Sequence, residues 1–307
     1  NRGHVYVTDM YNHRIQIFAR GVYGWRQANI NGFNSRDNEG IGALAVLSDT
    51  LYAATTYNWK TGGEIWRLGE TWTPVITGGL GVAHNVGVDE LMPFKGDLYA
   101  GTWAGENNSG QVWRSADGIA WTCVISNGLG HPGNCDVLQF FASDNLYAGT
   151  CSCTETHGAE IWRSASGDPL SWSRVVTDGF GAGPDNSCVT AFELFDAHLY
   201  AGTFNYETGG QIWRTMDGRD WEQVAEHGLG DYDNDAIGSF AVFGTRLYVG
   251  TRHSDAGGEI WRCTICDGTD WEQVVDGGFG DTDNRGIMGL IAKDDSLYAV
   301  TENDQTG

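Results

Sequence analysis

A five-residue phrase, Leu-Tyr-Ala-Gly-Thr or a close variant, recurs through almost the whole chain of 307 residues. Successive copies are spaced 47, 48, 53, 48 and 50 residues apart and begin at Leu51, Leu98, Leu146, Leu199, Leu247 and Leu297. A period of this length indicates one supersecondary unit copied in series, in which each unit buries its apolar faces against its neighbours. We therefore expect a single repeat domain over residues 1–307.

Residues 189–236 show what one unit contains. Short runs of alternating apolar and polar residues are separated by turns rich in Gly, Asp and Asn, and they lie at 189–195, 199–203, 211–214 and 221–224. No stretch keeps a period of about 3.6 residues, so we expect almost no helix. Four short strands in one repeat describe a propeller blade. The expected fold class is all-β, a β-propeller of four-stranded blades.

The two ends of the chain leave the number of blades open. We expect blades at about residues 1–40 (partial), 41–86, 87–135, 136–188, 189–236, 237–285 and 286–307 (partial). The partial blades supply three and two strands, which gives 25 strands in all, one more than six complete blades require. Six blades are favoured, with the strand at 286–292 completing the N-terminal blade. Seven blades are the alternative if the chain is a fragment of a longer protein.

A large excess of acidic side chains limits the partners. The formal charge is −22, from 40 acidic and 18 basic residues. Such a surface repels phosphate backbones, so we expect no nucleic-acid partner. No segment approaches the roughly 18 apolar residues of a membrane span, so we expect no membrane insertion. Basic partners or divalent cations suit this surface, and a strongly solvated secreted protein is the simplest explanation for it.

Residues 4–18, His-Val-Tyr-Val-Thr-Asp-Met-Tyr-Asn-His-Arg-Ile-Gln-Ile-Phe, resemble an NHL repeat. The later copies, over residues ~41–307, resemble Asp-box (BNR-like) propellers, because residues 115–121 and 215–221 are similar to the signature Ser-x-Asp-x-Gly-x-x-Trp, one residue shorter. That family includes sialidases and non-enzymatic receptors, so the resemblance implies a fold and not an activity. A sialidase-like site would need an arginine triad, whereas the arginines here recur in every Ile-Trp-Arg strand and are interpreted as scaffold.

Two tryptophans depart from the repeat. Eleven of the 13 occupy fixed positions on third or fourth strands, where we expect them to pack between blades. Trp59 and Trp103 instead fall in loops between second and third strands, and Tyr57, Phe204 and Tyr206 lie in corresponding segments. Aromatic side chains on one face suggest a surface that stacks sugar rings or a partner's apolar side chains. Covering of the local loop backbone is the alternative.

The loops between blades each carry an asparagine, and two of them add alternating carboxylates. The asparagines are interpreted as turn-stabilising residues, and they are Asn38, Asn85, Asn134, Asn186, Asn234 and Asn284. The carboxylates are candidate Ca²⁺ ligands, because Ca²⁺ takes about six to eight oxygens, and they are Asp231, Asp233, Asp235, Asp281 and Asp283. The complete calcium-loop signature is missing, so solvated acidic turns are the alternative. Ca²⁺ is the one candidate cofactor.

The seven cysteines indicate disulfide bonds. We expect a local bond between Cys263 and Cys266. The predicted hairpin places Cys135 opposite Cys151 or Cys153, with Cys188 nearby, so two further disulfides are expected from these four. A zinc site in the same cluster is the alternative. Cys123 is left over, either buried or free to pair between chains. Disulfides place the protein outside the cytoplasm, extracellular or at the cell surface.

These features favour a non-catalytic binding or assembly module that presents one loop-rich face to a glycan or protein, including further copies of itself, with Ca²⁺ assisting. The alternative is a glycan-active enzyme, glycosidase- or sialidase-like, in which loop carboxylates near the propeller axis act on a glycosidic bond. Its candidates lie between second and third strands, and they are Glu106, Glu155, Glu207 and Asp255. None of them has a distinguishing partner in the sequence.

Overall fold

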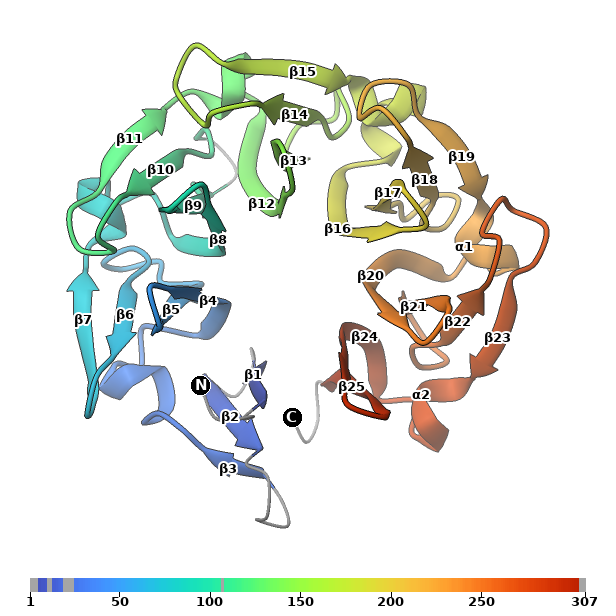
Figure 1. Cartoon of the computed structure of the whole chain (residues 1–307), viewed down its shortest axis with the longest axis horizontal. Helices are drawn as coiled ribbons and strands as arrows, with labels where there is room; N and C mark the ends of the chain where they lie inside the picture. The colour runs from blue at the N-terminus through green and yellow to red at the C-terminus, as the bar shows by residue number, and fades with distance from the viewer. Residues whose placement is uncertain (1–4, 10–12, 19–24, 106–107, 304–307) are drawn as a thin grey trace. The chain divides into compact units, whose positions relative to one another are not determined.

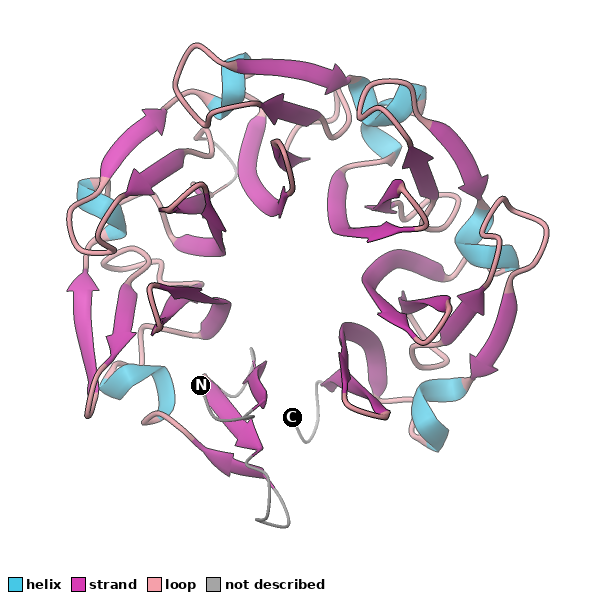
Figure 2. Cartoon of the chain, viewed as in Figure 1, coloured by secondary structure: helices cyan, strands magenta, loops and turns pink. Residues whose placement is uncertain are grey.

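The computed structural model describes residues 5–9, 13–18, 25–105 and 108–303, and these residues are nearly all in strands, turns and loops (Figures 1 and 2). The strands form antiparallel sheets of the blade type. The all-β propeller class expected from the repeat is therefore confirmed. Two elements, α1 (His227–Gly230) and α2 (Gly277–Gly280), are single turns of four residues. Among the described residues no helix is long and apolar enough to cross a membrane.

The chain forms two compact units, residues 1–153 with 163–173 and residues 154–162 with 174–307. In the first unit, β1 (Val5–Asp9), β2 (Arg14–Phe18) and β3 (Trp25–Gln27) form a three-stranded sheet. One blade consists of β4 (Gly40–Leu47), β5 (Thr50–Thr56), β6 (Ile65–Leu68) and β7 (Trp72–Ile76). The next consists of β8 (Gly87–Phe94), β9 (Asp97–Trp103), β10 (Val112–Ser115) and β11 (Thr122–Ile125). The hairpin of β12 (Asn134–Ala142) and β13 (Leu146–Ser152) follows.

Two strands, β14 (Ile161–Ser164) and β15 (Trp172–Val176), come next in the chain. The second unit then contains the blade of β16 (Cys188–Phe195), β17 (His198–Phe204), β18 (Ile212–Thr215) and β19 (Glu222–Ala225). It continues with β20 (Asn234–Phe243), β21 (Arg246–His253), β22 (Ile260–Cys263) and β23 (Glu272–Val275). The hairpin of β24 (Asn284–Lys293) and β25 (Ser296–Asn303) ends the described chain. The described residues thus form the 25 strands that we expect, while the single domain, its blade boundaries and the choice between six and seven blades stay predictions.

The first strand of each blade contains a β-bulge at a fixed place. In β8 the register against β9 shifts between Val88 and Glu90, which leaves Asp89 without a residue opposite. Equivalent shifts occur in the other first strands, at residues 41/43, 137/139, 189/191, 237/239 and 287/289. A bulge bends its strand and changes the direction of a side chain. The bulge therefore determines the direction in which the Asp89 side chain points.

The loops between blades contain a left-handed turn that a buried asparagine holds. Gly79, Leu80 and Gly81 have φ angles of 61°, 60° and 84°. A left-handed conformation costs a residue such as Leu80 roughly 1–2 kcal/mol. Asn85 offsets this cost, because its Nδ2 donates to the Gly79 carbonyl at 3.0 Å. The short turns of this kind are η2 (Asn31–Asn34), η3 (Gly79–Gly81), η4 (Gly128–Gly130) and η5 (Asp178–Gly181), with η6 (Gly183–Asp185) directly after η5.

The same asparagine also binds the third strand of the following blade. Asn85 Nδ2 donates to Gln111 Oε1 at 2.8 Å, and that oxygen accepts the indole N–H of Trp113 at 2.9 Å. Asn85 Oδ1 accepts from the Thr102 hydroxyl at 3.3 Å. The arrangement recurs around Asn38, Asn186 and Asn234. We call this chain of hydrogen bonds, from loop carbonyl through asparagine and Glu or Gln to tryptophan, the asparagine relay. It confirms the turn-stabilising role expected of these asparagines.

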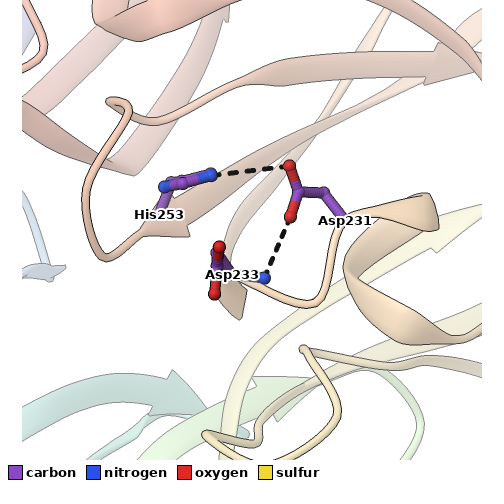
Figure 3. Close-up of side chains that lie close together, drawn as sticks. All are labelled: Asp231, Asp233 and His253. Carbon is purple, nitrogen blue, oxygen red and sulfur yellow. Dashed lines mark hydrogen bonds and ion pairs between the residues drawn. The ribbon is translucent and has the colours of Figure 1, made fainter.

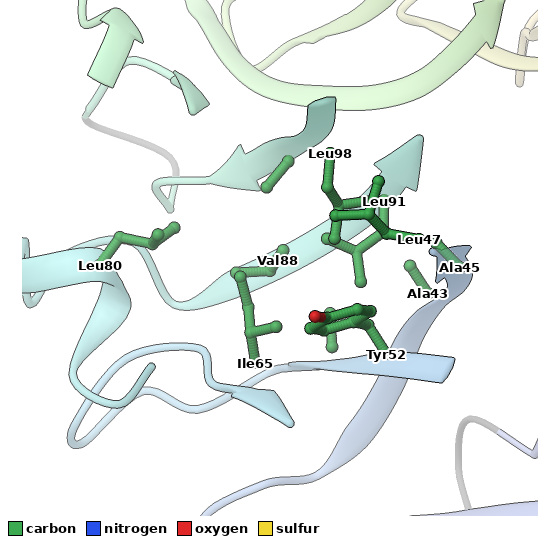
Figure 4. Packing of buried hydrophobic residues seen from close by; sticks show 11 residues of the cluster. Ala43, Ala45, Leu47, Tyr52, Ile65, Leu80, Val88, Leu91 and Leu98 are labelled. Atoms are coloured by element: carbon green, nitrogen blue, oxygen red, sulfur yellow. The ribbon is translucent and has the colours of Figure 1, made fainter. Parts of the chain in front are cut away.

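Aromatic residues join neighbouring blades. In the first unit, Tyr52 lies in an apolar cluster with residues of β4, β6, β8 and β9 (Figure 4), and its hydroxyl donates to the Asp117 carbonyl at 3.3 Å. A Cβ on Gly118 would lie 2.1 Å from that hydroxyl oxygen, so the turn accepts only glycine there. Tyr99 reaches Ser166 and Gly167 in the same way. Phe33 stacks on Trp66 with ring centroids 4.5 Å apart, as expected for scaffold aromatics.

Six of the seven cysteines are in disulfide bonds. Cys135 is bonded to Cys153 and Cys263 to Cys266. Cys151 and Cys188 are disulfide-bonded as well. The zinc alternative is wrong, because none of these six retains a thiolate. Cys123 is free and half-buried, and burial raises the pKa of its thiol.

We predict that Asn85→Ala destabilises the protein by about 2–4 kcal/mol, because it removes three hydrogen bonds and leaves buried groups without partners. Urea unfolding followed by tryptophan fluorescence measures the loss. Asn127→Ala, an exposed site in the next loop, is the control and should change stability by less than about 0.5 kcal/mol. Equal effects of the two changes would contradict the role of the asparagine relay.

Candidate functional site

Two loops between second and third strands are built on a buried asparagine side chain. Asn58 Oδ1 accepts the backbone N–H of Thr61 at 2.9 Å, and its Nδ2 donates to Asn38 Oδ1 at 2.7 Å. In the second unit, Asn205 Oδ1 accepts the N–H of Thr208 at 2.8 Å, and Nδ2 donates to Asn186 Oδ1 at 2.8 Å. Each of these residues is fully buried and connects its loop to the asparagine relay. We call them anchoring asparagines.

Aromatic side chains flank both anchoring asparagines. Tyr57 and Trp59 flank Asn58, and both pack edge-on against Trp103, with ring centroids 5.1 Å and 4.9 Å away. Trp59 is 57% exposed. Gly105 has a φ of 69°, and a Cβ there would lie 3.4 Å from the Trp59 ring. The structure thus brings three of the five predicted ligand-binding residues into one cluster, which we call the aromatic cluster.

The other two predicted residues form a pair in the second unit. Phe204 and Tyr206 flank Asn205 and contact each other edge-on, with ring centroids 4.4 Å apart. Tyr206 is 66% exposed. The anchoring asparagines were not predicted from the sequence. The motif aromatic-Asn-aromatic, which occurs at residues 57–59 and 204–206, is the signal that could have found them.

The predicted metal-ligating carboxylates divide into separate arrangements. Asp231, Asp233 and His253 each place one ligand atom within 4.8 Å of the others (Figure 3). Asp235 is not part of this group. It is buried, and its Oδ2 forms an ion pair with Arg252 at 2.6 Å. Asp281 Oδ1 accepts the N–H of Asp283 at 3.1 Å. No other group of three such residues occurs in the part of the chain that the structure describes.

His253 occupies the place of an anchoring asparagine. Its Nδ1 accepts the backbone N–H groups of Asp255 and Ala256 at 3.1 Å and 2.9 Å. The ring proton therefore lies on Nε2, which faces Asp231 Oδ2 at 3.5 Å. A metal-bound histidine normally donates its second ring N–H to an acceptor. His253 cannot do so, and this leaves Asp231 and Asp233 as the oxygen ligands that the loop offers.

A third group of acidic residues was not recognised in the sequence. Asp89 and Glu90 lie at the bulge of β8, and Asp136 lies on β12. Burial raises the pKa of Asp89 to about 6, that of Glu90 to about 8, and that of Asp136 well above its ordinary value. The neighbouring Asp89 carboxylate raises the pKa of Asp136 further, whereas the hydrogen bond between the two side chains lowers the pKa of Asp89. In other blades the place of Asp136 is taken by residues such as Gly87 and Ala236, and this contrast is the signal that the sequence offered.

Among the described residues, no two of the carboxylates proposed for catalysis interact with each other. Glu155, Glu207 and Asp255 are exposed. The backbone N–H of Glu207 donates to Asn205, and that of Asp255 donates to His253, so both residues belong to the anchored loops. Glu106 lies outside the described residues.

Comparisons with known proteins give one family match, at the beginning of the given sequence, and a distant structural likeness. A family model of the NHL repeat matches residues 1–18, in agreement with the resemblance of residues 4–18. No curated protein matches the chain. One similar solved structure is described as a structural and mechanistic analysis of two prolyl endopeptidases. It is 11% identical with a TM-score of 0.48, and the match covers 90% of this chain and 48% of that one, so the chain spans about half its length.

We predict that the protein loses stability as the pH rises from about 5 to 9 in divalent-free buffer. Raised pKa values mean that the folded state binds protons more tightly than the unfolded state. This stability is complete below the unfolded pKa of about 4 and is lost through about pH 6 for Asp89 and about pH 8 for Glu90. The loss should reach at least about 2 kcal/mol.

Urea unfolding at a series of pH values measures this loss. Glu90→Gln should flatten the upper part of the profile and Asp89→Asn the lower part. Glu155→Gln, at an exposed site, should leave the profile as it is. A wild-type profile without this decline would show that the acids are solvated in the folded protein.

Proposed function

We propose that this chain is a non-catalytic binding module that holds a protein or glycan partner through the aromatic cluster. The observation that carries the proposal is Trp59, 57% exposed yet fixed between Trp103 and the loop of Asn58. An exposed tryptophan on an ordered loop contributes apolar area with little loss of conformational entropy on binding. Residues of this kind are frequent at the energetic centre of interfaces.

A protein partner is favoured over a glycan by two features. The N-terminal NHL repeat suggests a propeller of the protein-binding type. The formal charge of −22 attracts a partner with basic side chains and speeds the encounter. A glycan remains the second candidate, because indole rings also stack on sugars.

The Asp-box resemblance of residues 115–121 and 215–221 is kept as a proposal. In the first of these segments, Asp117 caps its turn by accepting the N–H groups of Ile119 and Ala120.

We place the module outside the cytoplasm, secreted or at the cell surface. Six disulfide-bonded cysteines support this placement, because cytosolic reductants keep most thiols reduced. A glycan-active enzyme is the alternative function. It rests only on the exposed loop carboxylates Glu155, Glu207 and Asp255, without a partner that would distinguish an acid from a nucleophile.

Loss of partner binding in Trp59→Ala tests the proposal. The full chain would be screened on a glycan array and against peptide libraries that include basic sequences. Each hit should weaken at least about 10-fold in Trp59→Ala, a typical hot-spot loss. Leu170→Ser removes a fully exposed apolar side chain from another turn and should leave binding unchanged.

Two outcomes would overturn this function. One is binding that survives Trp59→Ala together with Trp103→Ala in a folded protein. The other is release of reducing sugar that is abolished by a single change such as Glu207→Gln, which would establish the enzyme.

Calcium is a second proposal for the loop of Asp231 and Asp233. These carboxylates lie close together beside His253. Such a pair suits a cation that takes two ligands from the protein and the others from water. Saturating Ca²⁺ should then raise the melting temperature, and Asp231→Asn with Asp233→Asn should make that rise smaller. Asp281→Asn is the control from the next loop. A melting temperature independent of Ca²⁺ and chelator in this comparison would eliminate calcium here.

A further inference from the structure

Three buried oxygens from three strands lack hydrogen-bond partners. They are Oγ1 of Thr56, Oδ1 of Asp89 and Oδ1 of Asp136. Thr56 is 1% exposed and Asp136 is 6% exposed. An unsatisfied buried polar atom costs about 1–3 kcal/mol, and more when it is charged. Three such atoms in one place therefore need an explanation within the molecule.

The three residues converge on one point between blades. A Cβ on Gly87 would lie 2.3 Å from Thr56 Oγ1 and 2.6 Å from Asp89 Oδ1. Asp89 is in hydrogen-bonding range of both Thr56 and Asp136, although Thr56 Oγ1 and the two Oδ1 atoms make no bond of acceptable geometry. Trp103 pairs through the backbone with Gly87 on one side and with Asp136 on the other, so the end of β9 joins β8 to β12. Because residue 87 has no side chain, the Thr56 and Asp89 oxygens can both approach its Cα closely.

A positive charge is missing from this group. Two carboxylates in contact repel each other, and buried carboxylates are stable only when a proton, a basic side chain or a metal ion compensates them. No lysine, arginine or histidine forms an ion pair with Asp89 or Asp136 among the described residues. Glu90, next to Asp89, is a further acidic side chain and supplies no positive charge.

We propose that Thr56, Asp89 and Asp136 bind a hard divalent cation, Ca²⁺ or Mg²⁺, between their side-chain oxygens. The ligands are all oxygens, two of them carboxylates, which is the donor set that these cations prefer. Zinc and copper prefer imidazole or thiolate, and neither lies in this group. Waters complete the coordination. The cation neutralises the carboxylate pair and connects β5, β8 and β12.

This site differs from the loop of Asp231 and Asp233 in its residues and in its burial. Those two side chains are exposed, whereas Thr56 and Asp136 are buried. It also goes beyond the binding function proposed above and does not depend on it. Since Trp103 pairs with both Gly87 and Asp136, the cation stabilises the strand end that carries part of the aromatic cluster.

Titration of the chelator-treated full chain with Ca²⁺ alone and with Mg²⁺ alone tests the proposal. Calorimetry should show a saturable site for at least one of the two cations, accompanied by a rise in melting temperature. Terbium(III), which replaces Ca²⁺ at oxygen sites, should give luminescence on tryptophan excitation. Asp136→Asn should weaken binding by about 100-fold or more, and Thr56→Val by about 10-fold.

Further variants keep the test decisive. Gly87→Ala places a methyl group 2.3 Å from Thr56 Oγ1 and 2.6 Å from Asp89 Oδ1, so it should displace both oxygens and abolish binding while every ligand remains. Asp231→Asn with Asp233→Asn, and separately Glu155→Gln, should leave the site intact. Circular dichroism and the melting temperature in chelator verify that each variant is folded. Thr56→Val, which nearly conserves volume, decides the matter if Gly87→Ala does not fold.

Three results would overturn the proposal. The first is the absence of saturable binding of both Ca²⁺ and Mg²⁺. The second is binding that survives Asp136→Asn and Thr56→Val in folded protein. The third is a pH profile of stability that is identical in chelator, Ca²⁺ and Mg²⁺, which would show that Asp89 and Asp136 share only a proton.

Discussion

The hydrogen bonds of one buried amide determine how each blade joins the next. Asn85 binds the carbonyl of a left-handed turn and, with the same nitrogen, the side chain of Gln111 on the next blade's third strand. A strained turn and a blade joint are therefore stabilised together. Because Gln111 in turn accepts the Trp113 indole, the position of a large aromatic side chain also depends on this amide. The loops that carry the aromatic cluster rest on the same network, through Asn58 and Asn38.

The residues that depart from the repeat form the candidate binding sites of the molecule. The anchoring position accepts Asn in two loops and His253 in another, and in each case a side-chain atom receives the N–H groups of the turn. Once the N–H groups of the turn have acceptors in this way, the residues on either side of the anchoring position are free to vary. They are aromatic beside Asn58 and Asn205, and basic or polar beside His253. A rigid loop with variable flanks is the arrangement that binding surfaces generally require.

Much of the fold was predictable from the sequence, and much of the candidate site was not. The period and the alternation of side chains gave the strands, the turns and the disulfide of Cys263 with Cys266, because these depend on neighbours in the chain. Trp59 and Trp103 were expected on one face because both lie near the ends of second strands in adjacent blades, but the contact between their rings was not predicted. The meeting of Thr56, Asp89 and Asp136 could not be foreseen. It depends on a bulge that redirects Asp89, and no local pattern in the sequence announces that bulge.

The reach of Tyr52 into the turn at Gly118 has a consequence for how such a chain can grow. The tyrosine and the glycine that receives it belong to different copies of the repeat, so no copy contains a complete joint. A gene duplication that inserts one whole period restores every joint, since each new tyrosine meets a new glycine. An insertion shorter than one period leaves a tyrosine without its glycine and so breaks one joint. A chain built on this joint can therefore lengthen without a broken contact only by whole repeats.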